Sequence, residues 1–195
     1  MPEPRIAYRF LILLADTEPL VWRRIVLPRD ASFWALHVAI QDAMGWMDTH
    51  LHVFEVVPPR GGPVAHIGLP DPEFGRRVKD GRRCRLTTWF RPQGMPARYR
   101  YDFGDDWCHI VECEGYEDMD DGPYPRCLDG GGACPPEDCG GTHGYRELLR
   151  IQSDPDDPDH AGMLEWAGGP IDPHAFSPEA VLFEDPAVRA KLAFG

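Results

Sequence analysis

The segment that most constrains the fold is a predicted β-hairpin over residues 97–113. Residues 97–103 alternate between apolar and polar side chains, which is typical of a strand with one buried face. Gly104-Asp105-Asp106 has the chemistry of a tight turn, because glycine permits positive φ and aspartate can bond its own backbone. The return strand has one side made of Trp107, His109, Val111 and Cys113. This hairpin predicts a sheet built on antiparallel pairing.

A long segment rich in turn residues follows the hairpin. Residues 114–144 contain Cys127, Cys134 and Cys139 among many glycines and prolines, and they are expected to form one irregular loop. A loop of this length inside a compact domain needs a reason to be ordered. Its turn residues and cysteines predict an ordered Ω-like segment docked on the hairpin.

The N-terminal part of the chain predicts three strands and a helix. Residues 6–14 and 21–27 read as strands joined by a short turn, so they are expected to pair antiparallel. Ser32 is a good N-cap for a helix over residues 33–44, which Gly45 would end. His37 on the apolar stripe of that helix is interpreted as a satisfied histidine at the edge of the core. Residues 50–57 form the next predicted strand.

The remaining segments predict shorter elements around that framework. A loop with short strands near residues 64–67 and 76–78 is expected, and then a short helix at 86–90 with Thr87 as its cap. Further helices are predicted over 144–151 and 160–167, and helical turns at Ser177-Pro178 and Asp185-Pro186. We therefore expect one α+β domain over residues 1–195, with a core over about 6–176 and a helical tail over 177–195.

Charge and cysteine content narrow the classes of function. The 195 residues carry a formal net charge of −12, and a field of that sign repels phosphate backbones. Nucleic-acid binding would need a local basic patch, and the candidates are Arg76-Arg77, Lys79, Arg82-Arg83-Cys84-Arg85, Arg98 and Arg100. A solvated loop and strand face is the favoured interpretation of these residues. Without a visible signal peptide or membrane span, we expect a cytoplasmic protein with no membrane partner, whose six cysteines are reduced or metal-bound.

Several short motifs, taken together, resemble one known family. They are Val21-Trp22-Arg23-Arg24-Ile25, Ala43-Met44-Gly45-Trp46 with His50-Leu51-His52, Tyr101-Asp102-Phe103-Gly104-Asp105-Asp106-Trp107 with His109, and Cys134-Pro135-Pro136-Glu137-Asp138-Cys139-Gly140-Gly141 with Gly144-Tyr145. In this order they resemble the plasmid pRiA4b ORF-3-like family over about residues 6–176. The resemblance implies an α+β fold with a curved, mostly antiparallel sheet and packed helices, and a link to plasmid and insertion-element genes. It implies no enzymatic role that can be transferred residue by residue.

The cysteine-rich segment offers a candidate metal site. A structural zinc ion takes four thiolate or imidazole ligands in a tetrahedron, and Cys127, Cys134 and Cys139 with His143 or, alternatively, His109 could supply them. Similar sequences can carry an apolar residue at Cys139, which weakens the case for a cysteine-only site. The favoured alternative is reduced thiols in a loop held by prolines and turn hydrogen bonds.

A second candidate metal site would use His50, His52 and His109. If the strands over 50–57 and 107–113 are neighbours, these imidazoles converge, with Asp102, Asp105 or Asp106 to orient them. Three ligands leave an open position, which is the kind of site that activates water. The alternative is a polar network that holds the turn at Gly104.

A ligand-binding groove is predicted beside the Gly104 turn. Its candidate residues are Trp22, Arg24, Trp46, Asp102, Asp105 and Trp107. We find no nucleophile–base pair, phosphate loop or cofactor fingerprint, so the favoured function is a non-enzymatic accessory module that binds a small ligand or a protein. A metal-dependent hydrolase using His50, His52 and His109 is the first alternative, and a DNA-associated accessory protein is the second. Zinc is the cofactor that the cysteine set would take.

Overall fold

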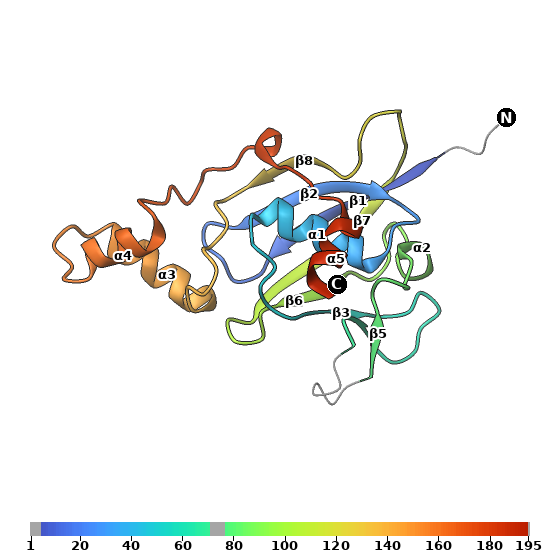
Figure 1. Ribbon diagram of the computed structural model, residues 1–195, viewed down its shortest axis with the longest axis horizontal. Helices are drawn as coiled ribbons and strands as arrows, with labels where there is room; N and C mark the ends of the chain where they lie inside the picture. Colours follow the sequence, from blue (N-terminus) through green and yellow to red (C-terminus); the bar gives the residue numbers. More distant parts are fainter. Residues whose placement is uncertain (1–4, 71–76, 195) are drawn as a thin grey trace.

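The computed structural model describes residues 5–70 and 77–194, which form a single α+β domain around one sheet (Figure 1). The strands are β1 (Ile6–Leu14), β2 (Val21–Pro28), β3 (His52–Val56), β4 (Ala65–Gly68), β5 (Val78–Asp80), β6 (Ala97–Tyr101), β7 (Trp107–Asp118) and β8 (Arg126–Gly131). The helices are α1 (Phe33–Met44), α2 (Leu86–Trp89), α3 (Gly141–Gln152), α4 (His160–Ala167), the 3₁₀ turn η2 (Pro178–Ala180) and α5 (Pro186–Phe194). None of these helices has the length and apolar character needed to cross a bilayer.

The eight described strands lie in the order β5-β4-β3-β6-β7-β1-β2-β8. All neighbouring pairs are antiparallel except β4 and β5. The predicted hairpins are confirmed: β1 pairs with β2, and β6 pairs with β7 through the turn at Gly104. The strand predicted near residues 76–78 lies partly outside the described residues, and β5 covers its end.

One face of the sheet carries the core, and α1 packs on that face. Alternate residues of β1 are fully buried, as expected of a half-buried strand. The predicted helix over 33–44 is confirmed: the Ser32 hydroxyl accepts from the Ala35 amide at 3.1 Å, and Gly45 ends the helix at φ 93°. Only glycine adopts that backbone region without steric cost, so the sequence stops the helix there.

The segment after the hairpin is more regular than predicted. β7 continues to Asp118, because residues 115–118 pair with the beginning of β1 across a register shift. β8 then lies along the edge of β2. The prediction of a structureless loop over 114–144 is therefore wrong in these two stretches. Their polar and glycine-rich composition conceals strands that are stabilised by backbone pairing rather than by side-chain burial.

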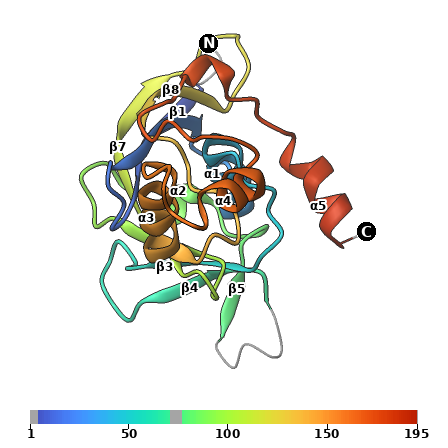
Figure 2. The same cartoon turned by 90° about the vertical axis from the view of Figure 1, so that its left-hand side faces the viewer.

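The C-terminal part leaves the sheet and then returns to it. α3 and α4 extend beyond one end of the sheet (Figure 1), whereas the tail comes back so that α5 lies beside α1 (Figures 1 and 2). The Trp34 indole nitrogen donates to the Pro186 carbonyl at 2.7 Å, which attaches the beginning of α5 to α1. The predicted helices near 144–151 and 160–167 and the helical turns after Ser177 and Asp185 are confirmed.

Candidate functional site

A buried polar cluster lies between α1 and the sheet. We call His37, Asp48 and His52 the inner cluster: His37 lies on α1, Asp48 in the following connection and His52 at the beginning of β3. One potential ligand atom of each residue lies within 4.8 Å of the other two. The imidazoles of His37 and His52 stack with ring centroids 3.5 Å apart and planes inclined by 10°. Asp48 adopts φ 59°, a left-handed conformation that aspartate tolerates better than most residues.

Hydrogen bonds run through the inner cluster in one direction. Gln41 Nε2 donates to the Tyr99 hydroxyl at 2.9 Å, so that hydroxyl can donate to His37 Nδ1 at 2.8 Å. His37 Nε2 then carries the ring proton and donates to Asp48 Oδ1 at 2.8 Å. This network assigns the tautomer of His37 and fixes the direction in which its ring points.

Burial determines the charges of the inner cluster. It lowers the pKa of both His37 and His52 well below the ordinary histidine value, because a charged imidazole would lose its hydration there. Burial also raises the pKa of Asp48 to about 6, although His52 and Arg189 act to lower it. Above that pH the cluster consists of two neutral imidazoles and a carboxylate, which is the protonation state that binds cations.

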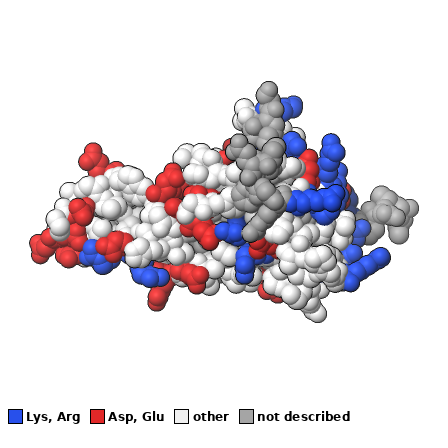
Figure 3. Space-filling view, turned by 90° about the horizontal axis from the view of Figure 1, so that it is seen from below, with Lys and Arg blue, Asp and Glu red and all other residues white. Residues whose placement is uncertain are grey.

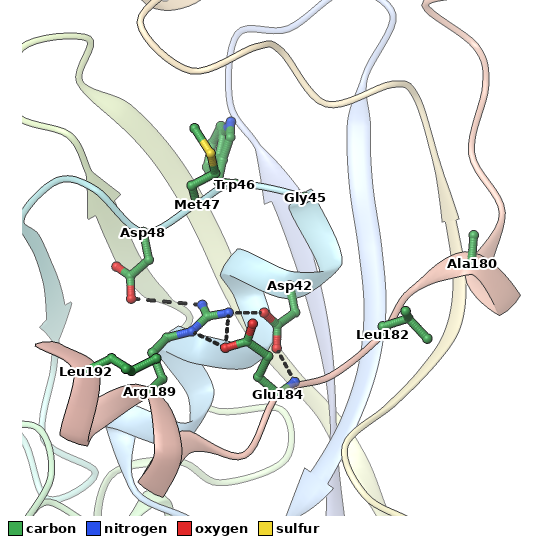
Figure 4. Close-up of a pocket in the computed structure, with 10 residues that line it drawn as sticks. All are labelled: Asp42, Gly45, Trp46, Met47, Asp48, Ala180, Leu182, Glu184, Arg189 and Leu192. Carbon is green, nitrogen blue, oxygen red and sulfur yellow. Dashed lines mark hydrogen bonds and ion pairs between the residues drawn. The ribbon is translucent and has the colours of Figure 1, made fainter.

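A cleft of roughly 670 Å³ opens beside Asp48, where α1 ends and the C-terminal tail returns (Figure 4). Arg189 of α5 reaches across its floor to Asp42 at 2.6 Å, to Glu184 at 2.9 Å and to Asp48 at 3.9 Å. The Glu184 amide also donates to Asp42 Oδ2 at 2.9 Å. The apolar rim is exposed, with exposed fractions of 76% for Met47, 83% for Leu182 and 82% for Leu192.

A second histidine–carboxylate group lies near the Gly104 turn, and we call His50, Asp102 and Asp138 the outer cluster. His50 Nε2 is 3.0 Å from Asp138 Oδ1 and 3.6 Å from Asp102 Oδ2. Asp102 and Asp138 also have positive φ, at 51° and 59°. The side chain of Asp138 is 68% exposed, so water competes for the contacts of this group.

Comparisons with known proteins decide the family. The model of the plasmid pRiA4b ORF-3-like family matches residues 6–180. The chain belongs to the plasmid pRiA4b ORF-3-like family. It is 37% identical over 161 residues to the uncharacterized protein y4hQ of Sinorhizobium fredii (strain NBRC 101917 / NGR234), covering 82% of this chain and 80% of that protein. The crystal structure of MM3350, a protein of unknown function from Methanosarcina mazei Go1, aligns with a TM-score of 0.85 and 34% identity over 92% of this chain and 99% of that one.

The pRiA4b ORF-3-like match includes the inner cluster but ends before most of the cleft's outer wall. His37, Asp48 and His52 lie within residues 6–180, whereas Leu182 to Leu192 follow the matched region. The cleft is therefore made where a family core meets a C-terminal segment beyond the family match.

The structure does not bring the predicted cysteine ligands into one group. Among the described residues, Cys127, Cys134, Cys139 and His143 do not form a set with ligand atoms within 4.8 Å of one another. His143 is exposed on α3, whereas the three thiols are half-buried. Burial raises the pKa of Cys134, and it raises that of Cys139 to about 12, so both are thiols at neutral pH.

The cysteine-rich segment is docked on the hairpin by hydrogen bonds, as the sequence predicted. The Trp46 indole nitrogen donates to the Pro135 carbonyl at 2.9 Å, and the Gly140 amide donates to Asp105 Oδ2 at 3.0 Å. The Tyr101 hydroxyl donates to Glu137. These contacts order the segment through hydrogen bonds, which is in line with the favoured interpretation of reduced thiols in a hydrogen-bonded loop.

The three histidines of the second predicted metal site lie in separate environments. β6 lies between β3 and β7, so the assumption that the strands carrying His52 and His109 are neighbours is wrong. His50 precedes β3 and contacts Asp138 within the outer cluster, while His52 stacks on His37. His109 is fully buried, and its Nε2 has no hydrogen-bond partner among the described residues.

The six residues of the predicted groove lie on two faces of the sheet. Trp107 and Trp46 pack together on the core side, with ring centroids 5.6 Å apart. Asp102 and Asp105 lie at the turn, where they accept from the Gly104 and Gly140 amides. Trp22 and Arg24 point to the other face, because strand alternation puts Arg23 on the core side. Arg24 pairs there with Glu114 at 2.8 Å.

Arg23, not Arg24, is the arginine that organises this region. It is 1% exposed, and its guanidinium donates to carbonyls of Ala43, Gly131 and Gly132 at 2.7–3.0 Å. It also lies 3.7 Å from the ring centroid of Phe176. The end of α1, the end of β8 and the returning tail are thus held by one buried cation.

Four of the seven described basic residues of the predicted patch are paired with carboxylates. Arg82 and Arg83 contact Asp80, Arg98 contacts Glu55, and Arg100 contacts Asp106, all within 4.0 Å. Arg76 lies outside the described residues. On the face shown in Figure 3, acidic side chains gather toward the end formed by α3 and α4, away from most of the basic ones. This pairing reduces the field available to a nucleic acid.

Sequence reasoning interpreted His37 as a satisfied histidine at the core edge and grouped His52 with His50 and His109, so it missed the contact between His37 and His52. Asp48, Tyr99 and Arg189 come from three distant segments, and spacing in the sequence does not relate them to one another. A usable signal was the pairing of a histidine on the core stripe of one helix with a histidine on the core face of a strand.

Proposed function

We propose that this protein is a non-enzymatic accessory module that binds its ligand in the cleft between the end of α1 and the C-terminal tail. The observation that carries the proposal is an exposed apolar rim around a floor of three carboxylates. Solvent-exposed leucine and methionine side chains that gather around polar groups are typical of recognition sites. This location replaces the groove beside the Gly104 turn and retains Trp46 from that prediction.

The charge of the floor favours a cationic ligand. Asp42, Asp48 and Glu184 face one cation, the guanidinium of Arg189, which leaves the floor with an excess of negative charge. Arg189 also shows that a planar cation fits between these carboxylates. We infer that the ligand carries a guanidinium or ammonium group next to an apolar group, as an arginine beside a leucine would in a partner protein. A link to mobile elements rests on the family relationship alone.

A titration of ¹⁵N-labelled protein with N-acetyl-leucyl-arginine amide tests the proposal. We expect amide shifts in residues 45–48 and 182–192, because both walls of the cleft would contact the peptide. The same peptide with citrulline in place of arginine is the charge control and should cause much smaller shifts. Glu184→Gln should weaken binding, whereas Glu147→Gln, on the remote helix α3, should not. Equal shifts with both peptides, or shifts confined to the Gly104 turn, would overturn the proposal.

A further inference from the structure

The geometry of the inner cluster points to a binding site for one divalent first-row transition ion. Its ligands would be one ring nitrogen from each of His37 and His52 and the carboxylate of Asp48. This metal site is a separate proposal from peptide binding in the cleft, and each proposal can be correct without the other.

The donor set selects the class of ion. Two imidazoles and one carboxylate suit zinc, cobalt, nickel or iron, whereas magnesium and calcium prefer oxygen ligands throughout. The two histidines are 0% and 5% exposed, so they are not ordinary solvated surface residues.

The surroundings of His37 match those of a metal ligand. Metal-bound histidines usually donate their second ring N–H to an oxygen that fixes the ring. Here the Tyr99 hydroxyl lies 2.8 Å from His37 Nδ1, and Gln41 in turn bonds that hydroxyl. In the structure that hydroxyl donates to Nδ1, so metal binding requires the ring proton to move from Nε2 to Nδ1 and the Tyr99 hydroxyl to accept from Nδ1 instead of donating to it. This change frees Nε2 for the ion without altering the charge of His37.

One adjustment is required on binding. An imidazole directs its lone pair in the plane of its ring, and the rings of His37 and His52 are nearly parallel at 3.5 Å. Their lone pairs therefore do not converge, and one ring must turn for both nitrogens to reach the roughly 2.0–2.1 Å that zinc prefers. The connection that carries Asp48 lies at the edge of the cleft, so the third ligand can adjust with it.

Three protein ligands would leave a coordination position of the ion open. Asp48 is the ligand that lines the cleft, where Arg189 Nη1 lies 3.9 Å from Asp48 Oδ2. The guanidinium is the cation that now shares this carboxylate, and it would compete with a metal ion. The entry path for an ion is therefore the cleft rather than the sheet.

The test uses the full chain, freed of metal with a chelator and titrated with Co²⁺ at pH 7.5. Binding is followed by visible absorption, which reports nitrogen and oxygen ligation, and by calorimetry with Zn²⁺ and Mg²⁺. We expect one Co²⁺ or Zn²⁺ per chain and no comparable heat with Mg²⁺. His52→Gln and Asp48→Asn should each weaken binding by at least the roughly 10–100-fold that loss of a supporting group causes.

Two variants serve as matched controls. His50→Gln removes a histidine of the outer cluster, and Cys134→Ser removes a thiol of the predicted zinc set; both should retain full binding. Circular dichroism establishes whether each variant is folded. If His52→Gln does not fold, Asp48→Asn still tests the inference. A folded wild-type chain that binds no Co²⁺ or Zn²⁺ would overturn the inference. Loss of binding in either control, with retention in Asp48→Asn, would overturn it equally.

Discussion

The two histidine–carboxylate groups of this molecule contain similar side chains in opposite surroundings. The inner cluster is buried between α1 and β3, and each bond of His37 is made to a buried or half-buried partner. The outer cluster is only partly buried: the side chain of Asp102 is 10% exposed, but those of His50 and Asp138 are 30% and 68% exposed. Burial multiplies the cost of an unpaired polar group, so the same residue types are expected to contribute far more to stability and to ligand selection in the inner cluster.

The largest expected difference is in stability. His37→Ala would leave the Tyr99 hydroxyl without its acceptor and Asp48 without its donor, and it would open a cavity beside His52. We expect a loss of about 3 kcal/mol in the free energy of unfolding, measured by urea denaturation. His143→Ala, at an exposed position on α3, is the control and should change it little. A loss below about 1 kcal/mol for His37→Ala would remove the contrast between the two clusters.

Acid should destabilise the buried side of the molecule through His109. Burial lowers the pKa of His109 to about 3, whereas the unfolded chain has an ordinary histidine pKa near 6.5. The unfolded state therefore binds more protons between these values, and stability falls as pH decreases through this window. From pH 6.5 to 5, His109 should account for a loss of about 2 kcal/mol.

His109→Gln isolates that contribution. Glutamine does not titrate, and His37 and His52, which change stability in the same direction, remain in both proteins. Asp48 acts oppositely, because its raised pKa favours the folded state as acid is added, and it also remains in both. The variant should show a shallower dependence of unfolding free energy on pH. Identical slopes for the two proteins would mean that His109 has the same pKa in the folded and unfolded states, against the lowered pKa expected here.

Removal of Arg189 should have an intermediate effect confined to the tail. Its pair with Asp42 is mostly buried, with side chains 13% and 4% exposed, so Arg189→Gln should cost about 1–2 kcal/mol. Hydrogen exchange should quicken over residues 182–192, and Co²⁺ affinity should rise several-fold because a competing cation is gone. Arg150→Gln, on α3, is the matched control. Unchanged exchange in the tail would show that Arg189 does not hold α5 over the cleft.

The smallest effect is expected in the outer cluster. His50→Ala should change the free energy of unfolding by less than about 1 kcal/mol, and any change should shrink in high salt, because solvent screens these contacts. A loss comparable to that of His37→Ala would show that the two clusters contribute equally to the free energy of unfolding.

The sequence predicted elements far better than it predicted the site. Ser32, Gly45 and the alternation of residues 97–113 carry local chemistry, so the helix and hairpin follow from their own residues. The inner cluster depends on non-local placement: β6 inserts between β3 and β7, which brings Tyr99 beside His37 and keeps His52 from His109. Arg189 reaches the cleft from the other end of the chain.

The cysteine prediction shows a different limit. Spacing of cysteines indicates which residues a loop could bring together, but their directions depend on how that loop is paired. Cys127 belongs to β8, and His143 lies on the exposed side of α3, so neither completes a tetrahedron with Cys134 and Cys139. A loop that is already held by Trp46, Tyr101 and Asp105 has less need of a metal staple.

Anomalous diffraction from crystals soaked in Co²⁺ tests most directly the claim that the inner cluster is a metal-binding site. Data collected on both sides of the cobalt absorption edge locate the ion without reference to any assumed ligand. We predict one dominant peak between His37, His52 and Asp48. A dominant peak at Cys134 and Cys139, a dominant peak in the outer cluster, or no ordered ion would contradict the account.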